Sequence, residues 1–162
     1  MPCLHGHLAN AARVTYPAAL QRCKLDAPLL AAGLLTEKNE QNPQYFNKIK
    51  KFFDDCYNND VDFVTSVITM EEYMVFPYRT HLTEYIDLFD RLIKAFGIKV
   101  VIIDEKIAKK AAQIRAEYKG FKAMDALQLA AAVIMRCDLF LTNDKQLMKF
   151  EEIECVTVDE LG

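Results

Sequence analysis

Glycine is scarce in this sequence, with only five residues in a chain of 162. The glycine-rich patterns that bind phosphate groups, G-x-x-x-x-G-K and G-x-G-x-x-G, are absent, and so is the G-x-S-x-G turn of serine hydrolases. The chain therefore has no P-loop, no dinucleotide-binding turn and no nucleophile elbow. Any catalytic chemistry has to come from other residue types.

Paired cysteines and clustered histidines are also missing. The five cysteines are scattered without a C-x-x-C pair, and two of the three histidines lie within the first seven residues. This spacing argues against a zinc site and against a disulfide framework. It predicts a reducing, cytoplasmic environment in which the cysteines pack as small apolar side chains.

Neither a transmembrane run nor an excess of basic charge is present. No apolar stretch reaches membrane-spanning length, and the start of the chain lacks the order of a signal peptide. The net charge is −3, so the protein has no bulk attraction for nucleic acids or membranes. Its length and its 52% hydrophobic content predict a single globular domain over residues 1–162.

Residue usage changes near position 36. Residues 1–36 are rich in Ala, Leu and Pro, and they contain none of the ten Phe and no Ile. We interpret this break as a misassigned start, a frameshift or a leader upstream of about residue 36. Translation of the other reading frames of the source DNA tests this hypothesis, and the absence of a better frame would reject it.

From residue 41 the pattern alternates between helices and strands. Helices are expected from Pro43 to Cys56, from Thr69 to a limit at Pro77, from Leu82 to Phe96, from Glu105 to Tyr118, from Asp125, and briefly from Asp144. Strands are expected at 61–66, 98–103, 139–141 and 155–158, the second of them buried on both faces. This alternation predicts an α/β fold with a central, mostly parallel sheet between two layers of helices.

Acidic residues recur at the ends of these elements. Asp125 opens an Ala- and Leu-rich helix, Asp144 follows the strand 139–141, Glu72 lies in the helix after the strand 61–66, and Asp26 precedes an apolar run. The ends of parallel strands and their helices converge on one edge of a sheet. Carboxylates without His or Cys suit Mg²⁺ or Mn²⁺ and favour phosphodiester cleavage over acyl transfer or redox chemistry.

Each acid also has a structural interpretation. Thr69-x-x-Glu72 and Asp125-x-x-Gln128 fit capping boxes, and Asp144 in a first helical turn gains from the helix dipole. For Glu72 taken alone, capping is favoured over catalysis. The functional interpretation depends on the matching placement of all the acids.

Three segments in this order resemble the PIN-domain ribonucleases, and most closely the VapC-type toxins of toxin–antitoxin pairs. They are Ser66-Val67-Ile68-Thr69-Met70-Glu71-Glu72, Asp125-Ala126-Leu127-Gln128-Leu129-Ala130-Ala131-Ala132 and Leu141-Thr142-Asn143-Asp144-Lys145, within a resemblance over roughly residues 40–160. The resemblance implies a PIN-like three-layer α/β/α fold and a metal-dependent endoribonuclease.

By this resemblance, Asp26, Glu72, Asp125 and Asp144 are catalytic acids that bind Mg²⁺ or Mn²⁺ around an attacking water. Thr142 and Asn143 position the metal site or the substrate phosphate. Arg115 is a further candidate for substrate contact, with an exposed, solvated side chain as the alternative. The implied partners are an RNA substrate, a cognate antitoxin that covers the acidic pocket, and a second copy of the chain, since dimers are usual in the family.

The front of the chain departs from the family pattern. Arg22-Cys23-Lys24-Leu25 is a poor core strand, and Asp26 is followed by Ala27 where the family has a hydroxyl residue. The sheet would lose its central strand and the site its first acid if this segment did not fold. The alternative function is therefore a PIN-like module that binds RNA or a protein without cleavage. A small-molecule phosphatase is disfavoured, because the chain has neither a nucleophilic Asp-x-Asp pair nor a P-loop.

Overall fold

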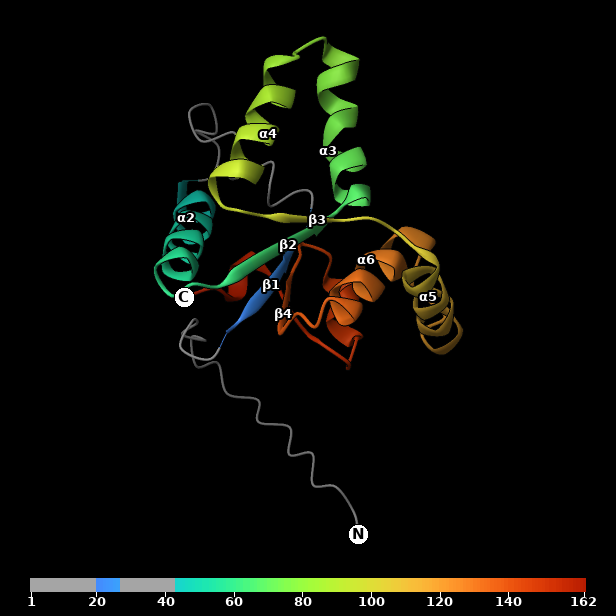
Figure 1. The fold of residues 1–162 in the computed structure, drawn as a ribbon. Helices are drawn as coiled ribbons and strands as arrows, with labels where there is room; N and C mark the ends of the chain where they lie inside the picture. The colour runs from blue at the N-terminus through green and yellow to red at the C-terminus, as the bar shows by residue number, and fades with distance from the viewer. Residues whose placement is uncertain (1–19, 27–42) are drawn as a thin grey trace.

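The computed structural model describes residues 20–26 and 43–162. A five-stranded sheet with the order β3-β2-β1-β4-β5 forms its centre, and all four strand pairings are parallel (Figure 1). The strands are β1 (Arg22–Leu25), β2 (Asp62–Ser66), β3 (Lys99–Val101), β4 (Leu139–Leu141) and β5 (Glu154–Val156). The helices are α2 (Pro43–Asn58), α3 (Val67–Thr80), α4 (Glu84–Ala95), α5 (Glu105–Glu117) and α6 (Ala123–Ile134), with 3₁₀ turns η1 (Lys145–Lys149) and η2 (Val158–Glu160).

Helices cover both faces of the sheet, so the predicted three-layer α/β/α fold is confirmed. One core joins α2, α4 and η2 to Cys23, Leu25, Leu139 and Leu141 of the central strands. The second core joins α5, α6 and η1 to Phe140 and to neighbouring strand residues. The alternation along β4, with Leu139 and Leu141 on one side and Phe140 on the other, follows the two-residue period of a strand.

The segment before Asp26 forms a central strand, although its sequence is a poor match to one. β1 lies third in the sheet, paired with β2 and β4. Arg22 at its start is satisfied by Asp62 at 2.8 Å and by the carbonyl oxygen of Met135 at 2.7 Å. Because its polar side chains find partners, β1 tolerates a composition that a central strand ordinarily avoids. The remainder of residues 1–36 lies outside the described residues, apart from this strand and its immediate flanks.

The helix α3 differs from the prediction at both ends. It begins at Val67 with Ser66 as its N-cap, and it continues through Pro77 to Thr80. The carbonyl oxygen of Pro77 accepts the backbone N–H groups of His81 and Leu82 at the end of the helix. The limit predicted at Pro77 is therefore wrong, since a proline removes one donor without removing the acceptors that complete the last turn. In Figure 1, α3 and α4 project together from the sheet as a helical hairpin.

The strand predicted at 98–103 is shorter and less buried than expected. β3 covers Lys99–Val101 at the edge of the sheet, and the side chain of Ile102 just beyond it is 74% exposed. An apolar, β-branched sequence predicts a strand, but its position within a sheet depends on pairings that the local sequence does not encode.

Among the described residues, no helix has the length and apolar character to cross a membrane. Cys23, Cys56, Cys137 and Cys155 are free and buried. The prediction that cysteines pack as small apolar side chains is confirmed for these four, and Cys3 lies outside the described residues.

Candidate active site

The first pair of candidate residues meets where β1 and β4 end. Leu25 and Leu141 are register partners, so the residues that follow them leave the sheet side by side. The buried hydroxyl of Thr142 donates to Oδ2 of Asp26 at 2.9 Å and accepts the backbone N–H of Asp144 at 3.1 Å. One threonine thus links the first and last acids of the predicted set. This position is where the strand order reverses, which is where open α/β sheets place ligand sites.

Asp144 caps the short turn that follows. Its Oδ1 accepts the backbone N–H of Gln146 at 2.8 Å at the start of η1. The capping interpretation therefore holds for this acid, and the bond also fixes the direction of its carboxylate.

Asp125 lies in the first turn of α6, as the third residue of the helix. Its Oδ2 accepts the backbone N–H of Lys122 at 3.3 Å, so Asp125 closes the cap from the third position instead of opening the helix as predicted. Burial raises the pKa of Asp125, and the negative charges of Asp144 and Asp26 raise it further.

Glu72 reaches the cluster from α3. The capping box predicted for Thr69 and Glu72 is wrong, because Ser66 caps this helix and Thr69 is already inside it. The Oε2 of Glu72 accepts a hydrogen bond of 3.4 Å from Nε2 of Gln128 on α6. Although the residue is exposed as a whole, burial of its carboxyl and the charge of Asp26 raise the pKa of Glu72.

The structure therefore brings all four predicted acids to one region. Asp26 is the common neighbour, since its charge acts on both Glu72 and Asp125, and Asp144 acts on Asp125. Ionised carboxylates that lie close together repel one another, and a cation between them relieves this repulsion. Within residues 20–26 and 43–162, however, His, Cys, Asp and Glu side chains do not form a group of three or more with the spacing of direct metal ligands.

A buried lysine under the acids is the main feature that the sequence did not reveal as functional. Lys24 in β1 is fully buried and donates to Gln128 Oε1 at 2.6 Å and to the carbonyl oxygen of Leu25 at 3.0 Å. Its Nζ lies 5.2 Å from the centroid of the Phe140 ring. Burial lowers the pKa of Lys24 to about 8, against the opposing charges of Asp26 and Glu72. The only signal in the sequence was a charged residue in a strand that should be apolar.

The predicted substrate residues Asn143 and Arg115 differ in their contacts. Asn143 is exposed, and its amide donates to the hydroxyl of Tyr45 on α2. Burial raises the pKa of Tyr45, and the charges of Asp159 and Asp26 contribute. Because Asn143 directly follows Thr142, which binds Asp26, this pair lies beside the Asp26 end of the cluster. Arg115 is exposed in the last turn of α5, where it makes no hydrogen bond or ion pair within the described part of the chain.

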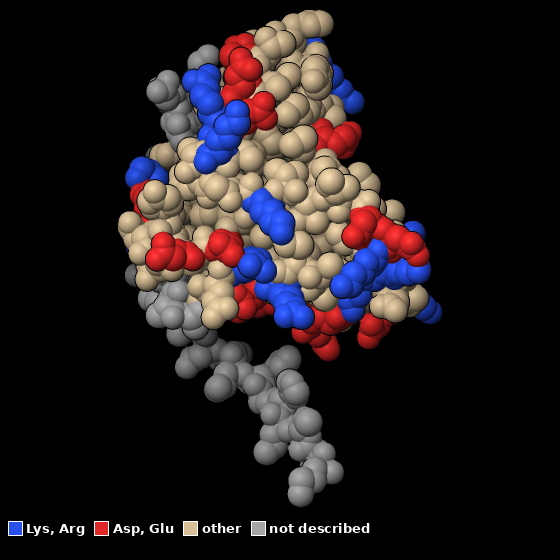
Figure 2. Space-filling view, in the orientation of Figure 1, with Lys and Arg blue, Asp and Glu red and all other residues tan. Residues whose placement is uncertain are grey.

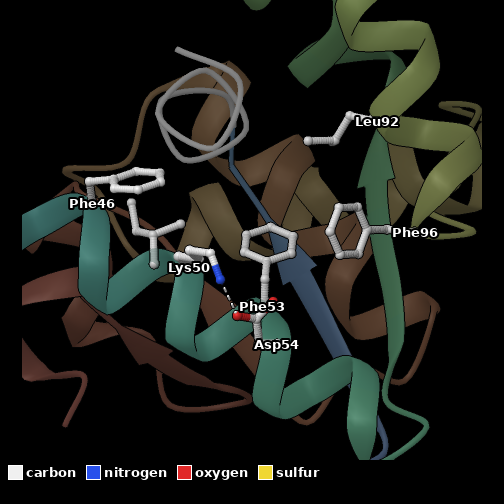
Figure 3. Close-up of a pocket in the computed structure, with 7 residues that line it drawn as sticks. Phe46, Lys50, Phe53, Asp54, Leu92 and Phe96 are labelled. Atoms are coloured by element: carbon white, nitrogen blue, oxygen red, sulfur yellow. Dashed lines mark hydrogen bonds and ion pairs between the residues drawn. The ribbon is translucent and has the colours of Figure 1, made fainter. Parts of the chain in front are cut away.

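A separate cavity lies between two helices. It has a volume of about 260 Å³ between α2 and α4, and Figure 3 shows Phe46, Phe53, Leu92 and Phe96 around it beside the Lys50–Asp54 ion pair. The cavity shares no residue with the acidic cluster. Figure 2 shows acidic and basic side chains interspersed on the face in view, without a continuous basic stripe.

Comparison with known proteins agrees with this geometry. The family model of the PIN domain matches residues 45–153, a range that includes three of the four acids and excludes Asp26. No curated protein matches the chain.

Several solved structures share the fold. A chain of the VapBC2 complex of Rickettsia felis, bound to a promoter DNA fragment, aligns with a TM-score of 0.68 at 10% identity, over 85% of this chain and 98% of that one. A chain of FitAcB from Neisseria gonorrhoeae aligns with a TM-score of 0.66 at 19% identity, over 86% of this chain and 99% of that one. A chain of a toxin–antitoxin complex from Klebsiella pneumoniae aligns with a TM-score of 0.58 at 22% identity, over 84% of this chain and 97% of that one.

Proposed function

Since this chain belongs to the PIN-domain family, we propose that it is a metal-dependent endoribonuclease that hydrolyses phosphodiester bonds of RNA. Its catalytic acids are Asp26, Glu72, Asp125 and Asp144. The observation that carries the proposal is the hydrogen-bonded arrangement at this edge of the parallel sheet, in which Thr142 links Asp26 to Asp144 and Gln128 of α6 binds Glu72. Burial and neighbouring carboxylates raise the pKa of Glu72 and of Asp125, and acids with perturbed pKa values are characteristic of functional sites.

The donor set suits a hard divalent cation. Carboxylate oxygens and one hydroxyl are the ligand types of Mg²⁺ and Mn²⁺, and the cluster includes no thiol or imidazole. Such an ion keeps several of its waters, so acids that lie too far apart for direct ligation can still hold it through water. When bound, the ion would supply an activated water and would stabilise negative charge on the phosphate.

The chain's own residues hold this arrangement in place. The Thr142 hydroxyl fixes Asp26, the N–H of Lys122 fixes Asp125, and the N–H of Gln146 fixes Asp144. With their directions set, the carboxylates orient the attacking water against the phosphodiester and accept its proton. A preformed set of acids does not have to reorganise during the reaction, which is the main source of electrostatic catalysis.

Thr142, Asn143 and Arg115 are the proposed substrate contacts. Asn143 is held by Tyr45 beside Asp26, where it can donate to a phosphate oxygen. Arg115 would contact RNA further from the cleaved bond.

We also propose that the protein is the toxin of a type II toxin–antitoxin pair, located in the cytoplasm. The fold is shared with chains of toxin–antitoxin complexes, and the free, buried cysteines suit a reducing compartment. The expected partners are an antitoxin that covers the acidic pocket and a second copy of the chain.

One observation favours a second function. Because no group of direct metal ligands forms among the described residues, the chain is alternatively a module that binds RNA or a protein without cutting. An enzyme binds Mn²⁺ through Asp125 and Asp144, whereas such a module does not.

The deciding experiment is incubation of the purified chain with mixed structured RNAs in Mg²⁺, in Mn²⁺ and in EDTA. Asp125→Asn is compared with Asp90→Asn, which changes an exposed acid on α4. We expect cleavage that requires metal, is lost in Asp125→Asn and is retained in Asp90→Asn. RNA binding without cleavage by the folded wild-type chain would support the binding module, and cleavage that persists in Asp125→Asn would reject the proposed site.

A further inference from the structure

We infer that Lys24 is a positioning residue that sets the orientation of the Gln128 side-chain amide and, through it, the position of Glu72. This role rests on the proposed function of Glu72 as a site acid. It concerns a residue that does not itself contact substrate, and it follows from the hydrogen-bond chemistry of the buried groups under the site.

Three donors converge on one oxygen of Gln128. Lys24 Nζ lies 2.6 Å from Oε1, Ser66 Oγ lies 2.8 Å from it, and Thr69 Oγ1 lies 3.1 Å from it. The other end of the amide, Nε2, donates to Thr69 Oγ1 at 2.9 Å and to Glu72 Oε2 at 3.4 Å. The amide therefore spans the space between a buried cation and a site carboxylate.

Among the three groups that contact Oε1, only Lys24 determines which way the amide faces. A hydroxyl can donate or accept, so Ser66 and Thr69 are compatible with either orientation. An ammonium group has donors only, so it must face the carbonyl oxygen of Gln128 and not its NH₂ group. The NH₂ group is then left to face Glu72. In the opposite orientation, Oε1 would lie against the Glu72 carboxylate, and two acceptors would repel each other.

Lys24 is itself held firmly enough to act in this way. Its three N–H donors meet three acceptors, the carbonyl oxygen of Leu25, Thr69 Oγ1 at 3.4 Å and Gln128 Oε1, and its Nζ also lies over the Phe140 ring. Among the described residues, no buried side-chain nitrogen or oxygen lacks a partner. A fully satisfied network of this kind specifies one arrangement.

The variant Lys24→Met removes this determinant without leaving an acceptor unpaired. Gln128 Oε1 keeps the Ser66 and Thr69 hydroxyls, and the carbonyl oxygen of Leu25 keeps Thr65 Oγ1 at 3.1 Å. Methionine is unbranched and fills the space of the lysine stem. We therefore expect Lys24→Met to fold. Lys94→Met, at an exposed position on α4, is the matched control.

The test is nuclear magnetic resonance of the ¹⁵N-labelled full chain without metal. The side-chain amide resonances of Gln128 are assigned through their contacts with Thr69. The change in their chemical shift that Glu72→Gln causes is then measured in the wild type, in Lys94→Met and in Lys24→Met. We expect a clear shift in the wild type and in Lys94→Met, and its loss in Lys24→Met. If Glu72→Gln still changes the Gln128 amide chemical shift in the Lys24→Met background, the inference is overturned. It is also overturned if Glu72→Gln changes no Gln128 amide chemical shift in the wild type, a result that can be obtained without any Lys24 variant.

RNA cleavage supplies a second, independent readout. We expect Lys24→Met to lower kcat by about 10- to 100-fold, the usual effect of losing a group that orients a metal-site residue. In the Glu72→Gln background, Lys24→Met should not lower kcat further, because Lys24 acts through Glu72. If Lys24 had only a general structural role, Lys24→Met would lower kcat in that background as well. If the wild type cleaves no RNA while Lys24→Met still abolishes the amide shift, the nuclease proposal fails and the role of Lys24 stands.

Discussion

The Thr142 hydroxyl donates a hydrogen bond of 2.9 Å to Oδ2 of Asp26 and at the same time accepts the backbone N–H of Asp144 at 3.1 Å. This one side chain couples the acid that follows β1 to the acid that follows β4. Because the parent strands are register partners up to Leu25 and Leu141, the sheet itself sets the distance between the two acids.

Thr142→Val should impair both the site and the fold. The substitution keeps the shape but leaves the part-buried Asp144 N–H without this acceptor, which costs about 0.5–1.5 kcal/mol in unfolding free energy. We expect RNA cleavage to fall by about 10- to 100-fold. Urea unfolding and cleavage assays measure the two effects. Thr80→Val, which removes an exposed hydroxyl bonded to Phe76, should change neither, and wild-type cleavage by Thr142→Val would contradict the role of this link.

Asp125→Asn should stabilise the metal-free protein at neutral pH. Burial, followed by the charges of Asp144 and Asp26, raises the pKa of Asp125 in the folded state, so ionisation of this group costs stability. For an acid whose pKa is raised in the folded state, folding stability begins to fall as the pH rises past the unfolded-state pKa of about 4. The loss is complete once the pH is above the folded-state pKa. We expect a gain in Tm of about 1–3 °C at pH 7, since screened charge interactions contribute up to about 1 kcal/mol.

The same variant should lose its response to metal. Mn²⁺ is expected to raise the Tm of the wild type and of Asp90→Asn, and to raise that of Asp125→Asn much less. Differential scanning fluorimetry between pH 4 and pH 8 gives both comparisons. An equal Mn²⁺ response in all three proteins would show that Asp125 does not contribute to cation binding.

Tyr45→Phe tests the position of Asn143. The substitution removes the hydroxyl that accepts a hydrogen bond from the Asn143 amide and keeps the ring. We expect the KM for RNA to rise by about 2- to 10-fold with little change in kcat, because one hydrogen bond contributes about 0.5–1.5 kcal/mol. Tyr57→Phe, at a side chain that is 62% exposed, should leave KM unchanged. A fall in kcat without a change in KM would place Asn143 in the chemical step instead.

The buried thiols predict a loss of stability in alkali. Burial raises the pKa of Cys56, Cys137 and Cys155 to about 12 each. The free energy of unfolding is therefore highest below about pH 9 and falls as the pH rises towards 12, because the thiols ionise at a lower pH in the unfolded state than in the folded state. Each thiol contributes a slope of about 1.4 kcal/mol per pH unit.

Cys56→Ala should therefore reduce the slope of unfolding free energy against pH in alkali by the contribution of one thiol, whatever its effect on stability at pH 7. Val61→Ala, another truncation in the same core, should lower stability without changing the slope. Urea unfolding at successive pH values from 8 to 10 measures both variants. An unchanged slope in Cys56→Ala would mean that this thiol ionises equally well in the folded protein.

Local pattern predicted most elements because helical and strand periodicity follow from side-chain spacing alone. It failed where tertiary contacts decide. Pro77 lies inside α3 because its carbonyl oxygen accepts the backbone N–H groups of His81 and Leu82 beyond it. The apolar run at β3 forms an edge strand with Ile102 exposed. The capping box predicted for Thr69 and Glu72 was wrong because the helix starts earlier, with Ser66 as its cap. The Ser66 hydroxyl also binds Gln128, which is distant in sequence.

The sequence by itself determined the α/β class, the order of the elements and the placement of acids at their ends, because these properties follow from spacing along one chain. Tertiary structure alone decided the strand order, the meeting of Asp26 with Thr142, and the partners of Lys24. A lysine in a central strand is unfavourable until Gln128, 104 positions away in sequence, supplies an acceptor for it. Its burial depends on contacts between distant segments, and such contacts exist only once the sheet and α6 have come together.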